Sequence, residues 1–518
     1  MVTFADVYPA QTVGQLTMFD RILFKGHLSG LYPAGKRFSW FLYQQGVLLK
    51  AFKPYAEQTT QQLRAQVEEI GQAAGCRVEY LANGRGPKGE KKEELAQQRL
   101  VARAGEKGLI AIFSALEVGN SFTVRGNRAR QELEVVTVPR KHLHYYLYYN
   151  DEEFGLMYVR IQSWWPMAVQ IYINGHEWLA RQLDKAGIGY VRHDNCLTAI
   201  ADLERAQALC DKFAHRQWDR VWNNFAQRVN PFLPAIEATM KKGYYWSIDQ
   251  CEMATDVMFG DQERVDALLP ALFQETLLTF SAEDVMRFLG RKLSGNFEGR
   301  VQTNLQKRQA GWRVKHWLKE NSLKMYNKSS VLRVETTINN SGEFKIAAPP
   351  GQTPRWKRMP KGVSYFWHFY QAGRQANQRY LDALRHLPAQ GKAATAALDS
   401  LCQSHDHHGQ RSAKFQPVAQ ATCQLFAAVL NGQHALTGFR NRHLRAALYP
   451  APAPDEPTEQ RRRARVSRLM AKLRGHGLIE RLEHSHLYRV TAFGYQAMAA
   501  ALRYRQVEYP TNFALVYN

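Results

Sequence analysis

The sequence predicts an α+β fold, with mixed helix and strand segments in an N-terminal and a central domain and a smaller, mostly helical domain at the end. Three observations support this. The 518 residues suffice for about three domains. Hydrophobic residues make up 45% and charged residues 22%, as in ordinary globular proteins. Alternating and helical apolar patterns both occur along the chain.

The composition indicates an anionic partner. Lys and Arg number 69 against 46 Asp and Glu, a formal net charge of +23. Such an excess favours nucleic acid as the partner, with DNA preferred and RNA left open. No apolar run approaches the roughly 18 residues that span a bilayer, and the start of the chain lacks the pattern of a signal peptide, so we expect no membrane partner. Six cysteines without CxxC spacing favour a cytoplasmic protein with reduced thiols.

The first predicted domain covers residues 1–130. Phe19–Leu28 is expected to form a strand, Gln61–Ala73 an amphipathic helix and Gly108–Phe113 a short buried strand. Nothing in these segments indicates what this domain does.

The second predicted domain covers residues 131–345 and is expected to hold an antiparallel sheet with helices. Val135–Tyr149 and Leu156–Ile173 read as strands, and Gly175–Ala186 has apolar residues at helical spacing. We take this domain as the candidate catalytic one.

Residues 346–434 are predicted to be a helical linker region, and residues 435–508 a compact module. In that module Arg461–Arg474 places Val466, Leu469, Met470 and Leu473 on one face of a basic helix. Gly475 and Gly477 then end the helix, and a two-stranded wing is expected from Leu478–Ile479 and Tyr488–Val490.

This module resembles the winged helix-turn-helix of MarR-type regulators. The resemblance implies that the basic helix enters a groove of DNA while the wing contacts phosphate. The residues that it assigns to nucleic-acid binding are Arg461, Arg462, Arg463, Arg465, Arg468, Lys472, Arg474 and Arg489.

The most informative stretch in the central domain is a predicted β-hairpin about Ser329-Ser330. Its alternating runs, Leu323–Lys328 and Val331–Ile338, would place Tyr326 opposite Arg333 and Lys324 opposite Glu335. Five apolar side chains would fill the opposite face: Leu323, Met325, Leu332, Val334 and Ile338.

The polar face of this hairpin is suited to phosphoryl chemistry. A tyrosine phenol becomes a nucleophile when nearby cations stabilise its phenolate, which Lys324, Lys328 and Arg333 are placed to do. Glu335 is a candidate ligand of a divalent ion, Mg²⁺ or Mn²⁺. The alternative is an ordinary sheet face with solvated charges.

The string KMYNK…LRVETTI also resembles the tyrosine element of rolling-circle replication initiators from plasmids and filamentous phages. Trp246–Phe259 resembles the strand with a central Asp that this family carries, here Asp249, and Phe288–Lys292 resembles its glycine-containing strand. The resemblance implies that Tyr326 is the nucleophile, with Lys328 beside it and Glu335 near the metal.

Family members also present two histidines on a strand, which His142 and His144 resemble. Residues i and i+2 of a strand point the same way, so both imidazoles could bind one cation. The alternative is two structural histidines.

Three functions remain open. The first is a mobile-element enzyme, a replication initiator or transposase-like endonuclease, that nicks and rejoins DNA through Tyr326 with a metal. The second is a non-enzymatic winged-helix DNA- or RNA-binding protein, such as a transcriptional regulator or an RNA-associated factor. The third is a metal nuclease that uses carboxylates such as Asp20, Asp249 and Glu335 without a tyrosyl intermediate. The sequence specificity and the oligomeric state are not indicated.

Overall fold

The computed structural model describes residues 4–278, 280–291, 301–308, 311–347, 356–385, 392–407, 410–431, 434, 438–482 and 485–505. It contains many helices and many strands, and most of the strands belong to one large sheet. This confirms the predicted α+β class.

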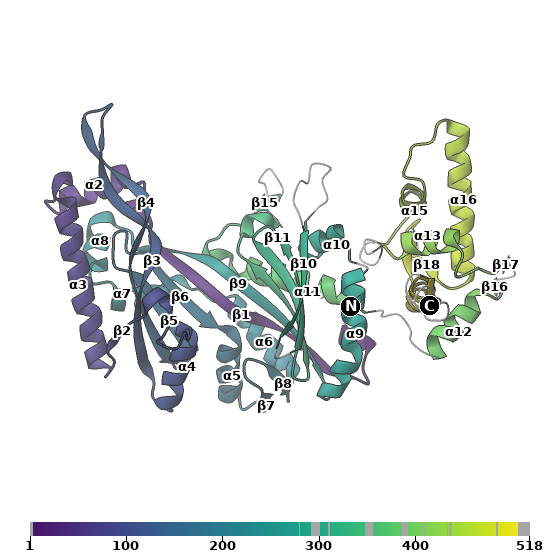
Figure 1. The fold of residues 1–518 in the computed structure, drawn as a ribbon, viewed down its shortest axis with the longest axis horizontal. Helices are drawn as coiled ribbons and strands as arrows, with labels where there is room; N and C mark the ends of the chain where they lie inside the picture. Colours follow the sequence, from purple (N-terminus) through teal and green to yellow (C-terminus); the bar gives the residue numbers. More distant parts are fainter. Residues whose placement is uncertain are drawn as a thin grey trace.

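An eleven-stranded sheet spans the first two thirds of the chain (Figure 1). Its strands, in spatial order, are β10 (Val301–Arg308), β11 (Gly311–Leu318), β12 (Asn321–Lys328), β13 (Val331–Ile338), β9 (Tyr244–Phe259), β1 (Thr12–Leu28), β6 (Val169–Asn174), β5 (Gly155–Gln162), β4 (Glu132–Asp151), β3 (Gly108–Asn127) and β2 (Val78–Tyr80). Neighbouring strands run antiparallel except β2 and β3, which are parallel. Small two-stranded pairs accompany the sheet: β7 (Tyr190–Arg192) with β8 (Leu197–Ile200), and β14 (Lys345–Ala347) with β15 (Trp356–Arg358).

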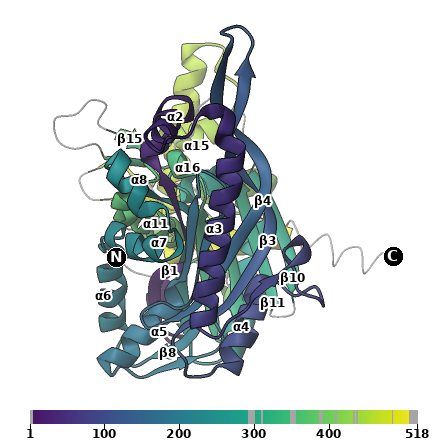
Figure 2. The same ribbon diagram turned by 90° about the vertical axis from the view of Figure 1, so that its left-hand side faces the viewer.

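Helices cover much of one face of this sheet. Phe19 on β1 stacks on Phe366 with ring centroids 4.3 Å apart, and Phe24 packs on Trp222 at 4.8 Å. Figure 2 shows the long helix α3 running along the sheet. The helices of this part are α1 (Phe4–Val7), α2 (Ala34–Gln44), α3 (Phe52–Ala73), α4 (Lys92–Ala102), α5 (Gly175–Ala186), α6 (Leu203–Ala214), α7 (Asp219–Val229), α8 (Leu233–Met240), α9 (Gln262–Leu278), α10 (Ala282–Phe288) and α11 (Phe366–Ala383).

The predicted boundary near residue 130 falls inside this sheet. It lies between β3 and β4, which pair from Gly108 opposite Asn150 to Asn127 opposite Glu132. Because β1 lies between β9 and β6, the first residues of the chain occupy the centre of the sheet. Strand order is set by contacts between distant segments, which local patterns do not reveal.

The predicted linker, residues 346–434, is divided between two cores. Phe366, Tyr370 and Tyr380 of α11 are buried in the core of the large sheet. Leu401 of α12 (Lys392–Leu401) and Phe426 of α13 (Gln420–Val429) are buried in a separate C-terminal core.

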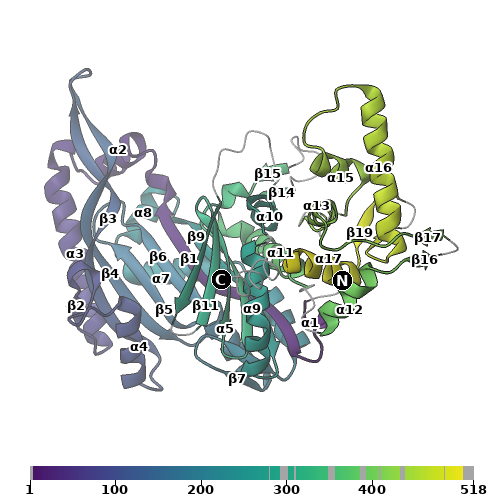
Figure 3. The ribbon, with the colours of Figure 1, turned by 45° about the vertical axis from the view of Figure 1, so that its right-hand side comes forward.

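The C-terminal core has the predicted order of elements (Figure 3). They are α13, α15 (Asn441–Leu448), α16 (Glu456–Gly475), β18 (Ile479–Arg481), β19 (Tyr488–Val490) and α17 (Ala492–Arg503), with a further strand pair, β16 (His405–His407) and β17 (Gln410–Ser412). Val466, Met470 and Leu473 are buried and Leu469 packs beside them, which confirms the predicted apolar face of the basic helix.

Two predicted strands differ from the observed elements. Leu156–Ile173 is divided into β5 and β6, because Ser163–Pro166 forms a bend between them. Phe288 ends α10 rather than beginning a strand, since Ser281 caps that helix through its hydroxyl, which accepts from the Asp284 N–H. Lys292, the end of the expected strand, lies outside the described residues.

Within the described ranges, we find no helix that combines the length and the apolar character needed to cross a bilayer.

Candidate functional site

The central hairpin forms in the predicted register. Tyr326 lies opposite Arg333 and Lys324 opposite Glu335, with Ser329 and Ser330 between the strands. Ser329 adopts a φ of +51°, in the left-handed region. The five predicted core residues are all at most 1% exposed: Leu323, Met325, Leu332, Val334 and Ile338.

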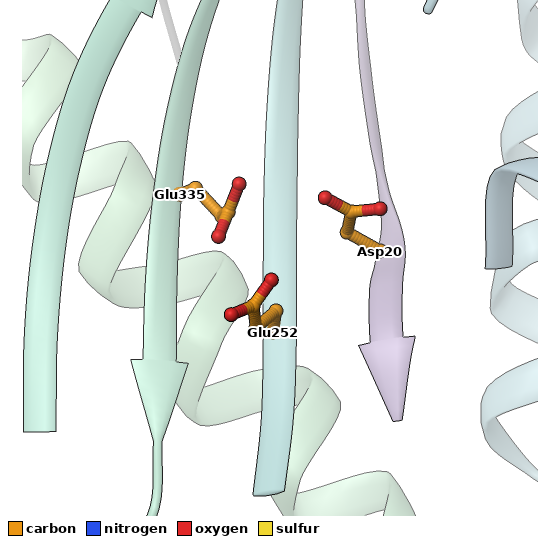
Figure 4. Close-up of side chains that lie close together, drawn as sticks. All are labelled: Asp20, Glu252 and Glu335. Carbon is orange, nitrogen blue, oxygen red and sulfur yellow. The ribbon is translucent and has the colours of Figure 1, made fainter. Parts of the chain in front are cut away.

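Three carboxylates from neighbouring strands meet beside this hairpin. Asp20 of β1, Glu252 of β9 and Glu335 of β13 each offer an oxygen, and these atoms lie within 4.8 Å of one another (Figure 4). The pairing of β1 with β9 shifts between Phe19 and Ile22, so a bulge with Asp20 and Arg21 faces Glu252. Bulges re-aim side chains in this way beside functional sites.

The three oxygens are spaced for one divalent ion. Ca²⁺ binds oxygen at 2.3–2.6 Å and Mg²⁺ at 2.0–2.1 Å, so two ligands on opposite sides of an ion lie about 4–5 Å apart. The observed limit of 4.8 Å falls in that range. These side chains therefore fit a hard, oxygen-binding cation.

A buried hydrogen-bond network fixes Asp20. The Arg333 guanidinium donates twice to Asp256, at 2.6 and 2.8 Å, and also to His176 Nε2 at 2.8 Å. Because arginine only donates, Nε2 accepts, and His176 Nδ1 carries the proton that it donates to Asp20 at 3.2 Å. Burial alone would raise the pKa of Asp20, but His176 and Arg333 hold it below its ordinary value.

The start of α5 explains how His176 reaches Asp20. A Cβ on Gly175 would lie 2.1 Å from the backbone oxygen of Phe19, so only glycine lets the helix approach β1 this closely. Asn174 caps the helix by accepting from the Glu177 N–H at 3.0 Å.

Glu252 has much weaker support than Asp20. Its one ion pair among the described residues is with Arg21, at 3.9 Å, and the Arg21 side chain is 60% exposed. Burial and the negative charge of Glu335 raise the pKa of Glu252 to about 8. Glu252 is therefore the carboxyl of the cluster whose ionised form is disfavoured by its neighbours.

Glu335 connects the cluster to the tyrosine. The Tyr326 hydroxyl donates to Glu335 Oε2 at 2.9 Å, and the Lys324 ammonium pairs with the other oxygen. Burial and the charge of Glu335 raise the pKa of Tyr326 well above 10. The predicted stabilisation of the phenolate is thus wrong, because Lys324, Arg333 and Lys328 are engaged with Glu335, Asp256 and Asp194.

These residues line a cleft of about 880 Å³. Its lining includes six arginines and lysines and seven carboxylates, so its formal charge is −1. Among the cations is Lys328, which is bound to Asp194 at 2.7 Å. A nucleic-acid phosphate would gain little electrostatic attraction from a lining of this charge unless a bound metal cation added positive charge to it.

Asp249 does not join the cluster. It is partly buried on β9, where it lines a second cavity of about 320 Å³ with Lys25 and Arg160. The resemblance pointed to Asp249 on this strand, whereas the acid that the structure places beside Glu335 is Glu252, three residues on.

His142 and His144 lie far from Glu335. They are on β4, five strand spacings or about 24 Å from β13. His142 stacks on Trp164 with ring centroids 5.0 Å apart, and His144 is 1% exposed, with burial lowering its pKa to about 4. They cannot share a metal with Glu335.

The predicted nucleic-acid residues lie together on α16 and the wing, distributed as follows. Exposed on α16 are Arg461, Arg463, Arg465, Arg468 and Arg474. Three others are engaged within the domain: Arg462 with the Ala451 carbonyl, Lys472 with the Lys414 carbonyl, and Arg489 with Glu480.

The metal-nuclease hypothesis named Asp20 and Glu335 of this cluster but missed Glu252, and local sequence gave some signal for the two acids outside the hairpin. Asp20 and Glu252 each lie in a strongly apolar run, FDRILF and QCEMATDVMF, where a charge needs a partner. Their proximity depends on β1 and β9 pairing across most of the chain. His176 had no signal beyond its place at a helix start.

No protein-family model, curated protein or solved structure matches this chain.

Proposed function

We propose that this protein is a divalent-metal-dependent enzyme that cleaves a phosphodiester bond of a nucleic acid. The observation that carries the proposal is the meeting of Asp20, Glu252 and Glu335 from three adjacent strands, within 4.8 Å and inside a polar cleft. Mg²⁺ or Mn²⁺ held there would neutralise a phosphate and bring it to the carboxylates.

In the reaction that we favour, water attacks the phosphorus. The P–O bond to the leaving strand breaks, giving one phosphate monoester end and one hydroxyl end. A carboxylate of the cluster would accept the proton that the water loses, and the leaving oxygen would take a proton from solvent.

A second candidate reaction uses Tyr326, and the 2.9 Å hydrogen bond to Glu335 supports it. The phenol would give its proton to Glu335 while its oxygen attacks the phosphorus. A tyrosine–phosphate ester then forms and a hydroxyl end leaves, as in replication initiators and related transposases of mobile elements. The raised pKa of Tyr326 is why we place this reaction second.

The exposed arginines of α16 support nucleic acid as the substrate, with DNA favoured by the likeness to MarR-type modules. The six free cysteines are compatible with a cytoplasmic location. A non-enzymatic regulator with the same module would bind nucleic acid without using the carboxylates.

Strand cleavage on a denaturing gel tests these proposals. We expect the full chain to cut labelled single-stranded DNA or RNA with Mg²⁺ or Mn²⁺ and not with EDTA. Glu252→Gln should lower the rate by more than about 100-fold, beyond the 10–100-fold typical of residues that only support a metal ligand. Glu57→Gln, on the exposed surface of α3, is the matched control.

Tyr326→Phe separates the two reactions. Cleavage that survives this change excludes the tyrosyl route, whereas loss of both cleavage and a covalent protein–DNA adduct favours it. Binding of nucleic acid without a metal, together with no cleavage of any strand, would refute both reactions. A non-enzymatic regulator would then be the remaining function.

A further inference from the structure

Two lysines face each other on neighbouring strands, and one of them, Lys324, lines the cleft. Lys315 of β11 lies directly opposite Lys324 of β12, and Arg313, two residues before Lys315, lies opposite Tyr326. Side chains of alternate residues share a face, so all three cations lie on the Tyr326 side of the sheet. Like charges directly opposite each other destabilise a sheet.

Two of these three cations, Lys324 and Arg313, have a polar partner within the described residues. Lys324 pairs with Glu335, and Arg313 donates to Gln306 at 2.6 Å. Lys315 makes no hydrogen bond or ion pair with any residue that the structure describes, and lies over the Trp317 ring at 4.6 Å. Burial, followed by the charges of Lys324 and Arg313, lowers the pKa of the Lys315 ammonium.

An ordinary solvated face does not explain this arrangement. Lys315 is only partly exposed, so water screens it less than a surface lysine. The Lys315 ammonium makes a cation–π contact with the Trp317 ring, which offsets part of this repulsion but neutralises no charge. Lys315 faces two other cations and has no carboxylate in contact among the described residues, since Glu252 and Glu335 act on it only at a distance. An anionic ligand at this position would remove the repulsion.

We propose that Lys315, together with Arg313 and Lys324, binds a phosphate group of the nucleic-acid strand that the carboxylate cluster cleaves. This rests on the proposed function, which supplies the strand. Lys315 lies two strand spacings, about 10 Å, from the strand of Glu335. It therefore holds a neighbouring phosphate and not the one under attack.

The test compares the full chain with Lys315→Met, which keeps the length of the stem and removes the charge. Lys53→Met on α3, where the side chain is 81% exposed, is the control. Fluorescence anisotropy with a labelled unpaired oligonucleotide, in EDTA and across a salt series, reports affinity. The melting temperature of each protein, measured with and without inorganic pyrophosphate, shows whether a free phosphate compound binds at the same site.

We expect Lys315→Met to weaken oligonucleotide binding about 3- to 10-fold and to lower the slope of log K against log salt by about 0.7, as for one lost phosphate contact. Its melting temperature should rise by about 1–2 °C, since the repulsion is gone. Lys315→Arg should restore the affinity. A purely structural lysine would show lower melting and unchanged binding.

Oligonucleotide affinity equal to that of Lys53→Met overturns the proposal, whatever the melting shows. If pyrophosphate stabilises the wild type but no oligonucleotide binds, a polynucleotide ligand is refuted. If Lys315→Met binds weakly but the wild type never cleaves, this inference stands and the proposed cleavage falls.

Discussion

The three carboxylates of the cluster are held in different electrostatic states. Asp20 accepts from His176 and from Asn195, at 3.2 and 3.0 Å, and Glu335 accepts from Tyr326 and pairs with Lys324. Among the described residues, Glu252 has one ion pair, with the solvent-exposed Arg21 at 3.9 Å, and the charge of Lys324 acts on it from farther away. Two of the groups are therefore supported as carboxylates by their neighbours, and the third is the one that a metal must deprotonate.

This asymmetry predicts a pH dependence of stability. The pKa of Glu252 rises from 4.5 to about 8 on folding, so the folded state binds more protons between these values. Its contribution is fully present below about pH 4.5 and is lost as the pH rises through about 8. We expect the free energy of unfolding in EDTA to fall by on the order of 5 kcal/mol across this window because of Glu252.

Urea unfolding followed by tryptophan fluorescence measures this dependence. Glu252→Gln should flatten the decline relative to the wild type, because glutamine does not titrate. Parallel pH profiles for the two proteins would contradict the assignment. Added Mn²⁺ should stabilise the wild type more at high pH than at low pH, since the ligand must lose its proton.

At the scale of elements, the hairpin of β12 and β13 shows what local sequence can predict. Its apolar and polar side chains alternate, and a slip of one residue would move Met325 and Val334 onto the polar face that holds Arg333 and Glu335, so the alternation fixes the register. Helix α5 was equally readable, since its apolar spacing and its bounds, Gly175–Ala186, coincide.

The rest of the site could not be predicted because it is non-local. Asp20 and Glu252 meet only through the pairing of β1 with β9, and the bulge that turns Asp20 inward leaves no local pattern. A motif resemblance filled that gap with Asp249, His142 and His144, which the sheet places in a second cavity and on a distant strand. The register of a hairpin predicts which side chains share a face of the sheet. The order of the strands, which local sequence does not reveal, decides which of these side chains become neighbours.

The turn of this hairpin gives a prediction for the element itself. Ser329 has a φ of +51°, a conformation that costs residues with a Cβ about 1–2 kcal/mol, whereas Ser330 has no positive φ. Ser329→Gly should therefore raise the free energy of unfolding by up to about 1 kcal/mol after the entropic cost of glycine. Ser330→Gly should lower it, and equal effects in urea titrations would argue against this turn geometry.

At the scale of the whole molecule, the described C-terminal elements have a buried core of their own, apart from the two apolar clusters of the large sheet, the smaller of which lies around Leu95 and Phe113. The main core of the sheet includes α11, and the C-terminal core begins at Ala397 and includes the basic helix α16. The cleft with its carboxylates belongs to the large sheet, and the exposed arginines of α16 to the C-terminal elements. This separation suggests that cleavage and recognition of nucleic acid are divided between two folding units.

The tryptophans make that division measurable, because all eleven lie at or before Trp367. Fluorescence thus reports the sheet core alone, while far-UV circular dichroism reports both cores. We expect the two urea transitions of the full chain not to coincide. A chain ending at residue 385 should keep the fluorescence transition and the metal-dependent cleavage of single strands, but lose at least about tenfold in affinity for duplex DNA, because α16 is gone. Coincident transitions, or a shortened chain that fails to fold, would show that the two cores form one cooperative unit, and the site would then have to be treated as depending on both.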